Sequence, residues 1–201
     1  MNNQKKYFML ADYDYSSIEL SNDDQDEIDF QLSFADPIKA EWEEPIEFEF
    51  RKPLPRKGTK ADSYFWRGST KVFSNRIKEV IELMNVPDID FIDAKINRKE
   101  EVYEGYFIMH VRRLITCFNK EKSKWKPPIF DPNKVMSIDK MVLDMDKLEK
   151  IPLQERLIFR LEECSVYHLF HESVVDAISA LTPKPTGFVF VSVGAWHSGV
   201  E

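Results

Sequence analysis

The stretch 72–93 has the sequence VFSNRIKEVIELMNVPDIDFID, and it aligns without a gap with 169–190, LFHESVVDAISALTPKPTGFVF. Apolar residues recur in both at the i, i+3, i+4, i+7 spacing of a helix with one buried face, on which Ile81 and Ile178 are equivalent. Each stretch then reaches a proline and continues as a short β-rich run. The alignment predicts a duplicated strand–helix–strand unit.

Short apolar or alternating runs predict the remaining strands. In 46–50, three apolar side chains alternate with two carboxylates, which is typical of a half-buried strand. The strands predicted in this way are Tyr7–Ala11, Glu47–Phe50, Ile89–Ala94, Tyr106–Val111, Lys140–Leu143, Leu157–Leu161, Val166–Phe170 and Phe188–Val193. Two main helices and short, mainly antiparallel strands predict the α+β class.

The length of 201 residues suits a single domain, 1–201, which composition divides into four parts. The N-terminal part, 1–63, is first acidic and then basic. The first repeat unit is expected at 64–118 and the second at 138–201. Between them lies a connection rich in proline and lysine, 119–137, whose prolines predict irregular structure.

Composition excludes several classes of protein. Cys117 and Cys164 are too few for a disulfide framework or a zinc knuckle, which favours the cytoplasm. No apolar run approaches the roughly 18 residues that span a bilayer. None of the six glycines lies in a GxGxxG, GxxxxGK[ST] or GxSxG pattern. We therefore expect a soluble cytoplasmic protein that binds no membrane and no cofactor.

The histidines give one candidate for catalysis. His168 and His171 lie in HLFHE, whose order differs from the HExxH of zinc peptidases, so we expect surface or helix-start histidines. His110 is expected to be a core or rim histidine with a single partner. A metal-dependent hydrolase that uses His168, His171 and an acidic pair stays open as the alternative function.

Three acidic pairs, at Asp12–Asp14, Asp88–Asp90 and Asp144–Asp146, place two carboxylates on one face of an extended chain. Such pairs hold Mg²⁺ or act as general acids and bases. No third ligand follows at a suitable spacing, and aspartate commonly caps helices or forms turns. Turn and cap roles are therefore expected.

Two segments, 64–67 and 122–126, combine aromatic and basic residues in a way that can bind nucleic acid. The sequence pI of about 5.3 opposes this function, because nucleic-acid affinity depends on neutralising phosphates. We expect a core strand at 64–67, a solvated loop at 122–126 and no nucleic-acid partner.

Charge is concentrated in the segment from Glu19 to Glu49, where twelve acids and one base give −11. The rest of the chain carries +4, for a total of −7. Aromatic residues are set among these acids, and such a surface suits a basic partner, although a solvated loop is the other interpretation. The predicted partner-binding residues, with Trp42 as the apolar anchor, are Asp23, Asp24, Asp26, Glu27, Asp29, Glu41, Trp42, Glu43 and Glu44.

Four motifs, together with the opening YFML, carry a resemblance to a known family. They are the stretch at 72–93, then YEGYFIMHVRRLITCFNKEKSKW, SIDKMVLD, and RLIFRLEECSVYHLFHESVVDAI followed by TGFVFV. In this order, over 64–193, they resemble bacterial immunity proteins of polymorphic toxin systems. The resemblance implies an α+β fold and a non-catalytic antitoxin that binds a cognate toxin domain and blocks it in the producing cell. A non-enzymatic scaffold or regulatory module is a further alternative.

Overall fold

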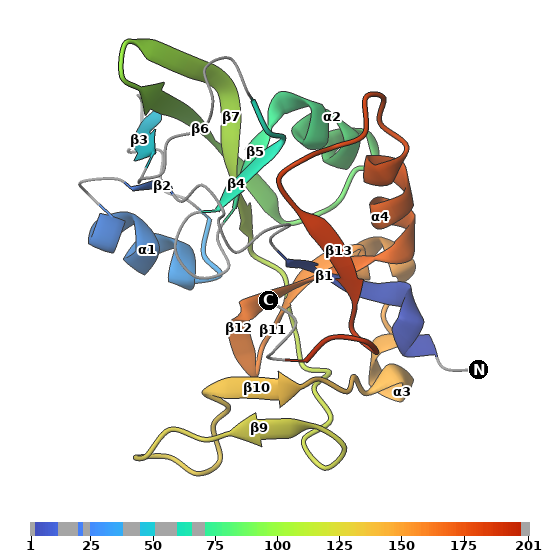
Figure 1. Ribbon diagram of the computed structural model, residues 1–201. Coiled ribbons are helices and arrows are strands. Elements are labelled where there is room, and N and C mark those ends of the chain that lie inside the picture. Colours follow the sequence, from blue (N-terminus) through green and yellow to red (C-terminus); the bar gives the residue numbers. More distant parts are fainter. Residues whose placement is uncertain are drawn as a thin grey trace.

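The computed structural model describes residues 3–11, 20–21, 25–37, 45–50, 60–65 and 71–197 (Figure 1). Within these residues the strands form a five-stranded sheet, a six-stranded sheet and a two-stranded hairpin. Most neighbouring strands are antiparallel. The parallel pairs are β3 (Ile46–Phe50) with β6 (Ile89–Arg98) and β8 (Leu114–Ile115) with β11 (Ile158–Leu161). Helices accompany the sheets, which confirms the predicted α+β class.

The five-stranded sheet has the order β13-β1-β12-β11-β8. Its strands are β1 (Tyr7–Ala11), β8 (Leu114–Ile115), β11 (Ile158–Leu161), β12 (Cys164–His171) and β13 (Val189–Ser192). The six-stranded sheet has the order β2-β3-β6-β7-β5-β4. Its strands are β2 (Leu20–Ser21), β3 (Ile46–Phe50), β4 (Ser63–Phe65), β5 (Lys71–Ser74), β6 (Ile89–Arg98) and β7 (Glu101–Val111). The described helices are η1 (Asn3–Lys6), α1 (Gln25–Ser33), α2 (Asn75–Leu83), α3 (Met145–Leu148), η2 (Leu153–Arg156) and α4 (Glu172–Ser179).

The two aligned stretches fold as β5–α2–β6 and as the end of β12 followed by α4 and β13. In each, one antiparallel strand separates the two strands of the stretch: β7 lies between β5 and β6, and β1 lies between β12 and β13. Both therefore have the strand–helix–strand order that the alignment predicts. That they are copies of one ancestral unit stays a prediction, as does the division of the chain at 63, 118 and 137.

The helices α2 and α4 pack against each other (Figure 1). Their buried faces lie in one apolar cluster. Ile81 is 1% exposed and Ile178 is 2% exposed, as their equivalent places in the periodic pattern predict. Phe73 of β5 and Phe170 of β12 belong to the same cluster. The cluster therefore joins the six-stranded sheet to the five-stranded sheet through their helices.

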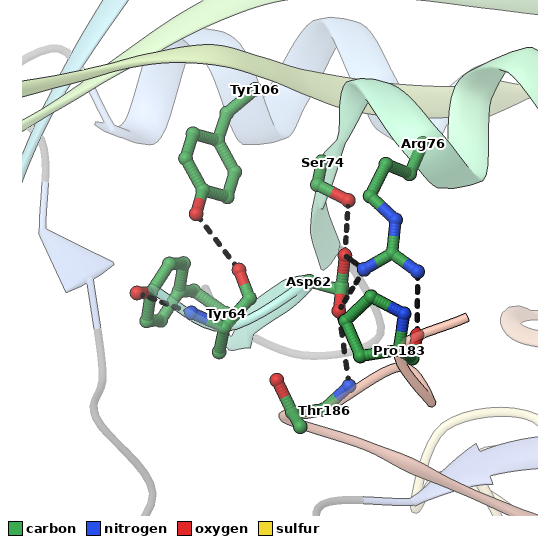
Figure 2. A network of polar contacts seen from close by, with 8 residues as sticks. Asp62, Tyr64, Ser74, Arg76, Tyr106, Pro183 and Thr186 are labelled. Carbon is green, nitrogen blue, oxygen red and sulfur yellow. Dashed lines mark hydrogen bonds and ion pairs between the residues drawn. The ribbon is translucent and has the colours of Figure 1, made fainter. Parts of the chain in front are cut away.

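A polar network around Asp62 makes a second connection between the sheets (Figure 2). The Asp62 carboxylate, 8% exposed, accepts hydrogen bonds from Ser74 Oγ at 2.8 Å and from the Thr186 amide at 3.2 Å, and it pairs with Arg76 at 3.4 Å. Arg76 also donates to the Pro183 carbonyl at 2.6 Å. Strand β4 and the start of α2 are in this way tied to the chain that enters β13.

Gly187 allows this close approach. Its φ is +92°, a region that L side chains rarely adopt, and a Cβ there would lie 2.1 Å from the Ser63 carbonyl oxygen. The amides of Asp62 and Ser63 both donate to the Thr186 carbonyl, at 3.0 and 3.2 Å. Glycine is therefore required where this segment crosses β4.

The sequence prediction was wrong in the connection between the repeat units. Strand β10 lies at Ser137–Lys140 rather than at Lys140–Leu143, and it pairs with β9 at Lys124–Lys126, where we expected a solvated loop. The pairing arises because Ile138 is 1% exposed and lies opposite the half-buried Trp125, while the lysines beside Trp125 point to solvent. The alternation of Lys124-Trp125-Lys126 was a strand signal. The predicted core strand at 64–67 is confirmed for β4, where Tyr64 is buried.

We expect Ile81→Ala and Ile178→Ala each to lower the free energy of unfolding by about 2–5 kcal/mol, because each leaves a cavity in the cluster between α2 and α4. Urea unfolding measures this change. Leu83→Ala is the control: Leu83 lies on α2 but is 81% exposed, so its cost should stay within about 0.5 kcal/mol. Equal costs at positions 81 and 83 would contradict the packing described above.

Candidate partner-binding site

The predicted partner-binding residues fall partly outside the described residues. Asp23, Asp24, Glu41, Trp42, Glu43 and Glu44 lie outside them. Asp26, Glu27 and Asp29 belong to α1, whose backbone is described. The site that can be built from the structure is therefore α1, the helix of the acidic segment.

Helix α1 has a buried face and an exposed aromatic face. Ile28 and Leu32, one turn apart, are 4% and 7% exposed and pack in the core of the six-stranded sheet. Phe30 is 66% exposed, and Phe34, just beyond the helix, is 47% exposed. Their rings meet edge to face with centroids 4.9 Å apart. Two adjoining phenyl rings thus face solvent on the most acidic part of the chain.

Arg160 holds the carboxyl end of α1. Its guanidinium donates to the carbonyls of Leu32 at 3.1 Å and Phe34 at 2.9 Å. Helix ends leave carbonyls without partners, so these bonds satisfy two of them and fix the direction in which α1 leaves the core. Arg160 lies on β11 and is 3% exposed, and burial lowers its pKa.

His110 makes the next contact along the same segment. Its Nε2 lies 3.0 Å from the Asp36 carbonyl oxygen, and because a carbonyl only accepts, Nε2 carries the proton. The side chain is 2% exposed, and burial lowers its pKa despite this hydrogen bond. The expectation of a core histidine with a partner is confirmed. Buried groups from β7 and β11 together anchor the segment 32–36.

The other two predicted histidines lie where the sequence indicates. His168 is half-buried in β12, and His171 is the N-cap of α4. The Nδ1 atom of His171 accepts a hydrogen bond from the Ser173 amide at 3.2 Å, which is a capping interaction. Burial lowers the pKa of His171. The prediction of a helix-start histidine is confirmed at His171.

The acidic pairs have structural partners where they are described. Asp88 pairs with Arg113 at 2.8 Å and Asp90 with Arg112 at 3.0 Å, and Asp88 adopts a turn conformation with φ +57°. Asp144 caps α3 by accepting from the Lys147 amide at 3.2 Å. Asp12 and Asp14 lie outside the described residues. Among the side chains that are described, no three His, Cys, Asp or Glu residues are grouped to hold a metal ion.

Sequence reasoning missed Phe34, Arg160 and His110 as parts of the site. Phe34 had a weak signal, since it lies four residues after Phe30 and out of phase with Ile28 and Leu32. For the anchoring residues Arg160 and His110 the sequence carries no such signal. Arg160 lies 128 residues along the chain from Leu32, and His110 lies 74 residues from Asp36.

The fold is that of an α+β protein whose helix α1 exposes an aromatic pair, and a comparison with known families assigns the chain to one of them. The model of the Imm11 immunity protein family matches residues 6–195. The chain belongs to this family, which confirms the resemblance to bacterial immunity proteins. A search of curated proteins found no match. No helix in the described part of the chain has the length and apolar character needed to cross a membrane.

We expect the free energy of unfolding to fall as the pH drops below about 6.5, the usual value for an unfolded histidine. Burial lowers the pKa of both His110 and His171, so below pH 6.5 the unfolded chain binds protons that the folded chain does not. Each histidine contributes up to about 1.4 kcal/mol per pH unit between its folded pKa and 6.5. Urea unfolding from pH 7.5 to 5.5 measures the slope.

The control is the double variant His110→Gln, His171→Asn, in which an amide keeps the donor at 110 and the cap at 171. Its slope over the same range should be smaller by the contribution of the two histidines. An NMR titration that gives either histidine a pKa of 6.5 or more in the folded protein would contradict the assignment.

Proposed function

We propose that this chain is a non-catalytic antitoxin of the cytoplasm, which binds a cognate toxin domain and blocks it in the producing cell. The acidic segment of Glu19–Glu49, with α1 at its centre, forms the toxin-binding surface. The residues proposed to contact the toxin are Asp23, Asp24, Asp26, Glu27, Asp29, Glu41, Trp42, Glu43 and Glu44, joined now by Phe30 and Phe34.

The observation that carries this proposal is the exposed pair Phe30–Phe34 on a helix whose end is fixed by buried groups. Large aromatic side chains dominate the affinity of protein interfaces when a partner buries them. A helix that is already anchored loses little conformational entropy on binding. An aromatic pair on an anchored helix has the properties of a preformed contact for a protein partner.

Charge supports the same proposal and indicates the nature of the partner. The segment carries −11, and a surface of one sign attracts a partner of the opposite sign over distances of about one Debye length, roughly 10 Å at 0.1 M salt. The proposed toxin domain is therefore basic on its contact face. Complementary charge speeds association, whereas Phe30, Phe34 and Trp42 are proposed to slow dissociation.

The first test is the stoichiometry of inhibition, with the candidate toxin, the product of the reading frame next to this gene, as the probe. We expect toxin activity to fall linearly with added protein and to reach its minimum at a fixed molar ratio near one. A binder must occupy each toxin molecule, whereas an enzyme acts at far lower ratios. Complete inactivation of the toxin at about one-hundredth of its concentration would favour the hydrolase alternative, and absence of binding would favour a scaffold.

The second test separates the two parts of the proposed surface by binding kinetics. We expect Phe30→Ser with Phe34→Ser to speed dissociation about 30-fold or more, because a buried aromatic anchor contributes about 2 kcal/mol or more. Neutralising Glu41, Glu43 and Glu44 together to glutamine should instead slow association and flatten its salt dependence. Stopped-flow or surface plasmon resonance at two salt concentrations measures both rates.

Leu83→Ser is the matched control, since Leu83 is an exposed apolar residue on α2 and lies outside the proposed surface. Its rates should equal those of the unaltered protein. A melting curve for each variant shows whether the fold is intact. Unchanged rates in both surface variants would remove the acidic segment from the interface.

A further inference from the structure

The hairpin of β9 and β10 lies at one end of the molecule (Figure 1). It carries a second exposed apolar surface. Ser137 pairs with Lys126 and Ile138 with Trp125, and the connecting turn runs from 127 to 136. In this turn the side chain of Ile129 is fully exposed and that of Phe130 is 85% exposed. Adjacent side chains of this size in full solvent contact are unusual in a turn, where polar residues, glycine and proline prevail.

Hydrogen bonds and prolines hold the turn in one shape. The Asp131 carboxylate accepts from the Asn133 amide at 3.0 Å, and the Asp131 carbonyl accepts from the Lys134 amide at 3.2 Å. Lys120 Nζ donates to the Asn133 carbonyl at 2.5 Å. Pro127, Pro128 and Pro132 restrict the backbone further. Because the turn is already ordered, a partner that buries its apolar tip meets a reduced entropic cost.

The hairpin is basic, in contrast to the acidic segment. Between positions 120 and 140 there are six lysines and three acids, a net charge of +3. The lysines, all exposed, are Lys120, Lys122, Lys124, Lys126, Lys134 and Lys140. A surface that accepts this tip is therefore apolar at its centre and acidic around it.

Helix α1 is the described part of the proposed toxin-binding surface, and its small size is one reason to expect a second contact with the same partner. A helix of nine residues is about 14 Å long, and its exposed face is far smaller than the roughly 800 Å² that each partner buries in a stable interface. The turn supplies further apolar area together with charge of the opposite sign. Two contacts of opposite sign also fix the orientation of the partner.

We propose that the 127–136 turn inserts Ile129 and Phe130 into an apolar, acid-rimmed depression of the toxin that binds α1, which rests on the proposed function above. A basic turn with an apolar tip also suits an anionic lipid surface, but a lipid is the poorer occupant because membership of an immunity protein family implies a protein partner. A second copy of this chain is also poorer. Its acidic segment would meet the hairpin head to tail, and such contacts propagate unless the rotation closes a ring.

The test is the affinity of the full chain for the same candidate toxin, the product of the reading frame next to its gene. We expect Ile129→Ser with Phe130→Ser to weaken binding at least tenfold, mainly through faster dissociation, while Leu83→Ser leaves it unchanged. Lys122→Glu with Lys124→Glu should slow association and reverse the part of its salt dependence that the hairpin lysines contribute. The apolar tip, Ile129 and Phe130, stays unaltered in this variant. Melting curves within a degree or two of the unaltered protein are expected, since the four altered side chains are all exposed.

The outcomes separate the two proposals. If the hairpin variants bind as tightly as the unaltered protein while the Phe30 and Phe34 variant is weakened, this inference is overturned and the proposed function stands. If the unaltered chain does not bind the toxin domain, both are overturned.

Two further measurements apply to the hairpin alone: sedimentation with vesicles of phosphatidylglycerol and phosphatidylcholine, and sedimentation velocity over a range of concentrations. Vesicle binding or self-association that is lost on Ile129→Ser with Phe130→Ser would overturn the inference in favour of lipid or a second copy.

Discussion

The packing of α2 against α4 is the contact on which the rest of the structure depends. Helix α2 packs beside strands of the six-stranded sheet and α4 beside strands of the five-stranded sheet. One apolar cluster between the two helices buries Ile77, Ile81, Val174 and Ile178. Burial of large apolar side chains is the main favourable contribution to folding, at about 25 cal/mol per Å². Because the two sheets meet through these helices, the positions of β7 and β11, and hence of His110 and Arg160, follow from this interface.

The Asp62 network fixes the position of the two sides of this interface relative to each other. Apolar packing is non-directional, so it brings the sheets together without fixing one arrangement. The carboxylate of Asp62 receives hydrogen bonds from both sides, from Ser74 before α2 and from Thr186 after α4, and Arg76 balances its buried charge (Figure 2). A buried carboxylate without these partners would be destabilising, so only the matched arrangement satisfies it. The network thereby selects one relative position of β4 and the segment that leads into β13.

The elements that sequence predicted correctly are those whose signal is local. The periodic pattern around Ile81 and Ile178 gave both helices and their buried faces, and alternation at 46–50 gave β3. The hairpin was predicted as irregular structure because of its three prolines, although the short alternation around Trp125 is typical of a strand. At the site, composition located the acidic segment and its aromatic content. It could not identify Arg160 as an anchor, because that role depends on the sheet order that brings β11 to the end of α1.

The buried charge of Arg160 fixes the orientation of α1 more than it stabilises the fold. Its partners at α1 are backbone carbonyls, which offset the loss of hydration only in part, and burial accordingly lowers its pKa. An apolar residue of similar volume often stabilises a core as well as a buried charge does. A guanidinium, however, donates two hydrogen bonds in a fixed geometry, so it holds the carbonyls of Leu32 and Phe34 in one arrangement. The orientation of α1, and with it the direction in which Phe30 and Phe34 face, is therefore set by a residue that does not reach the surface.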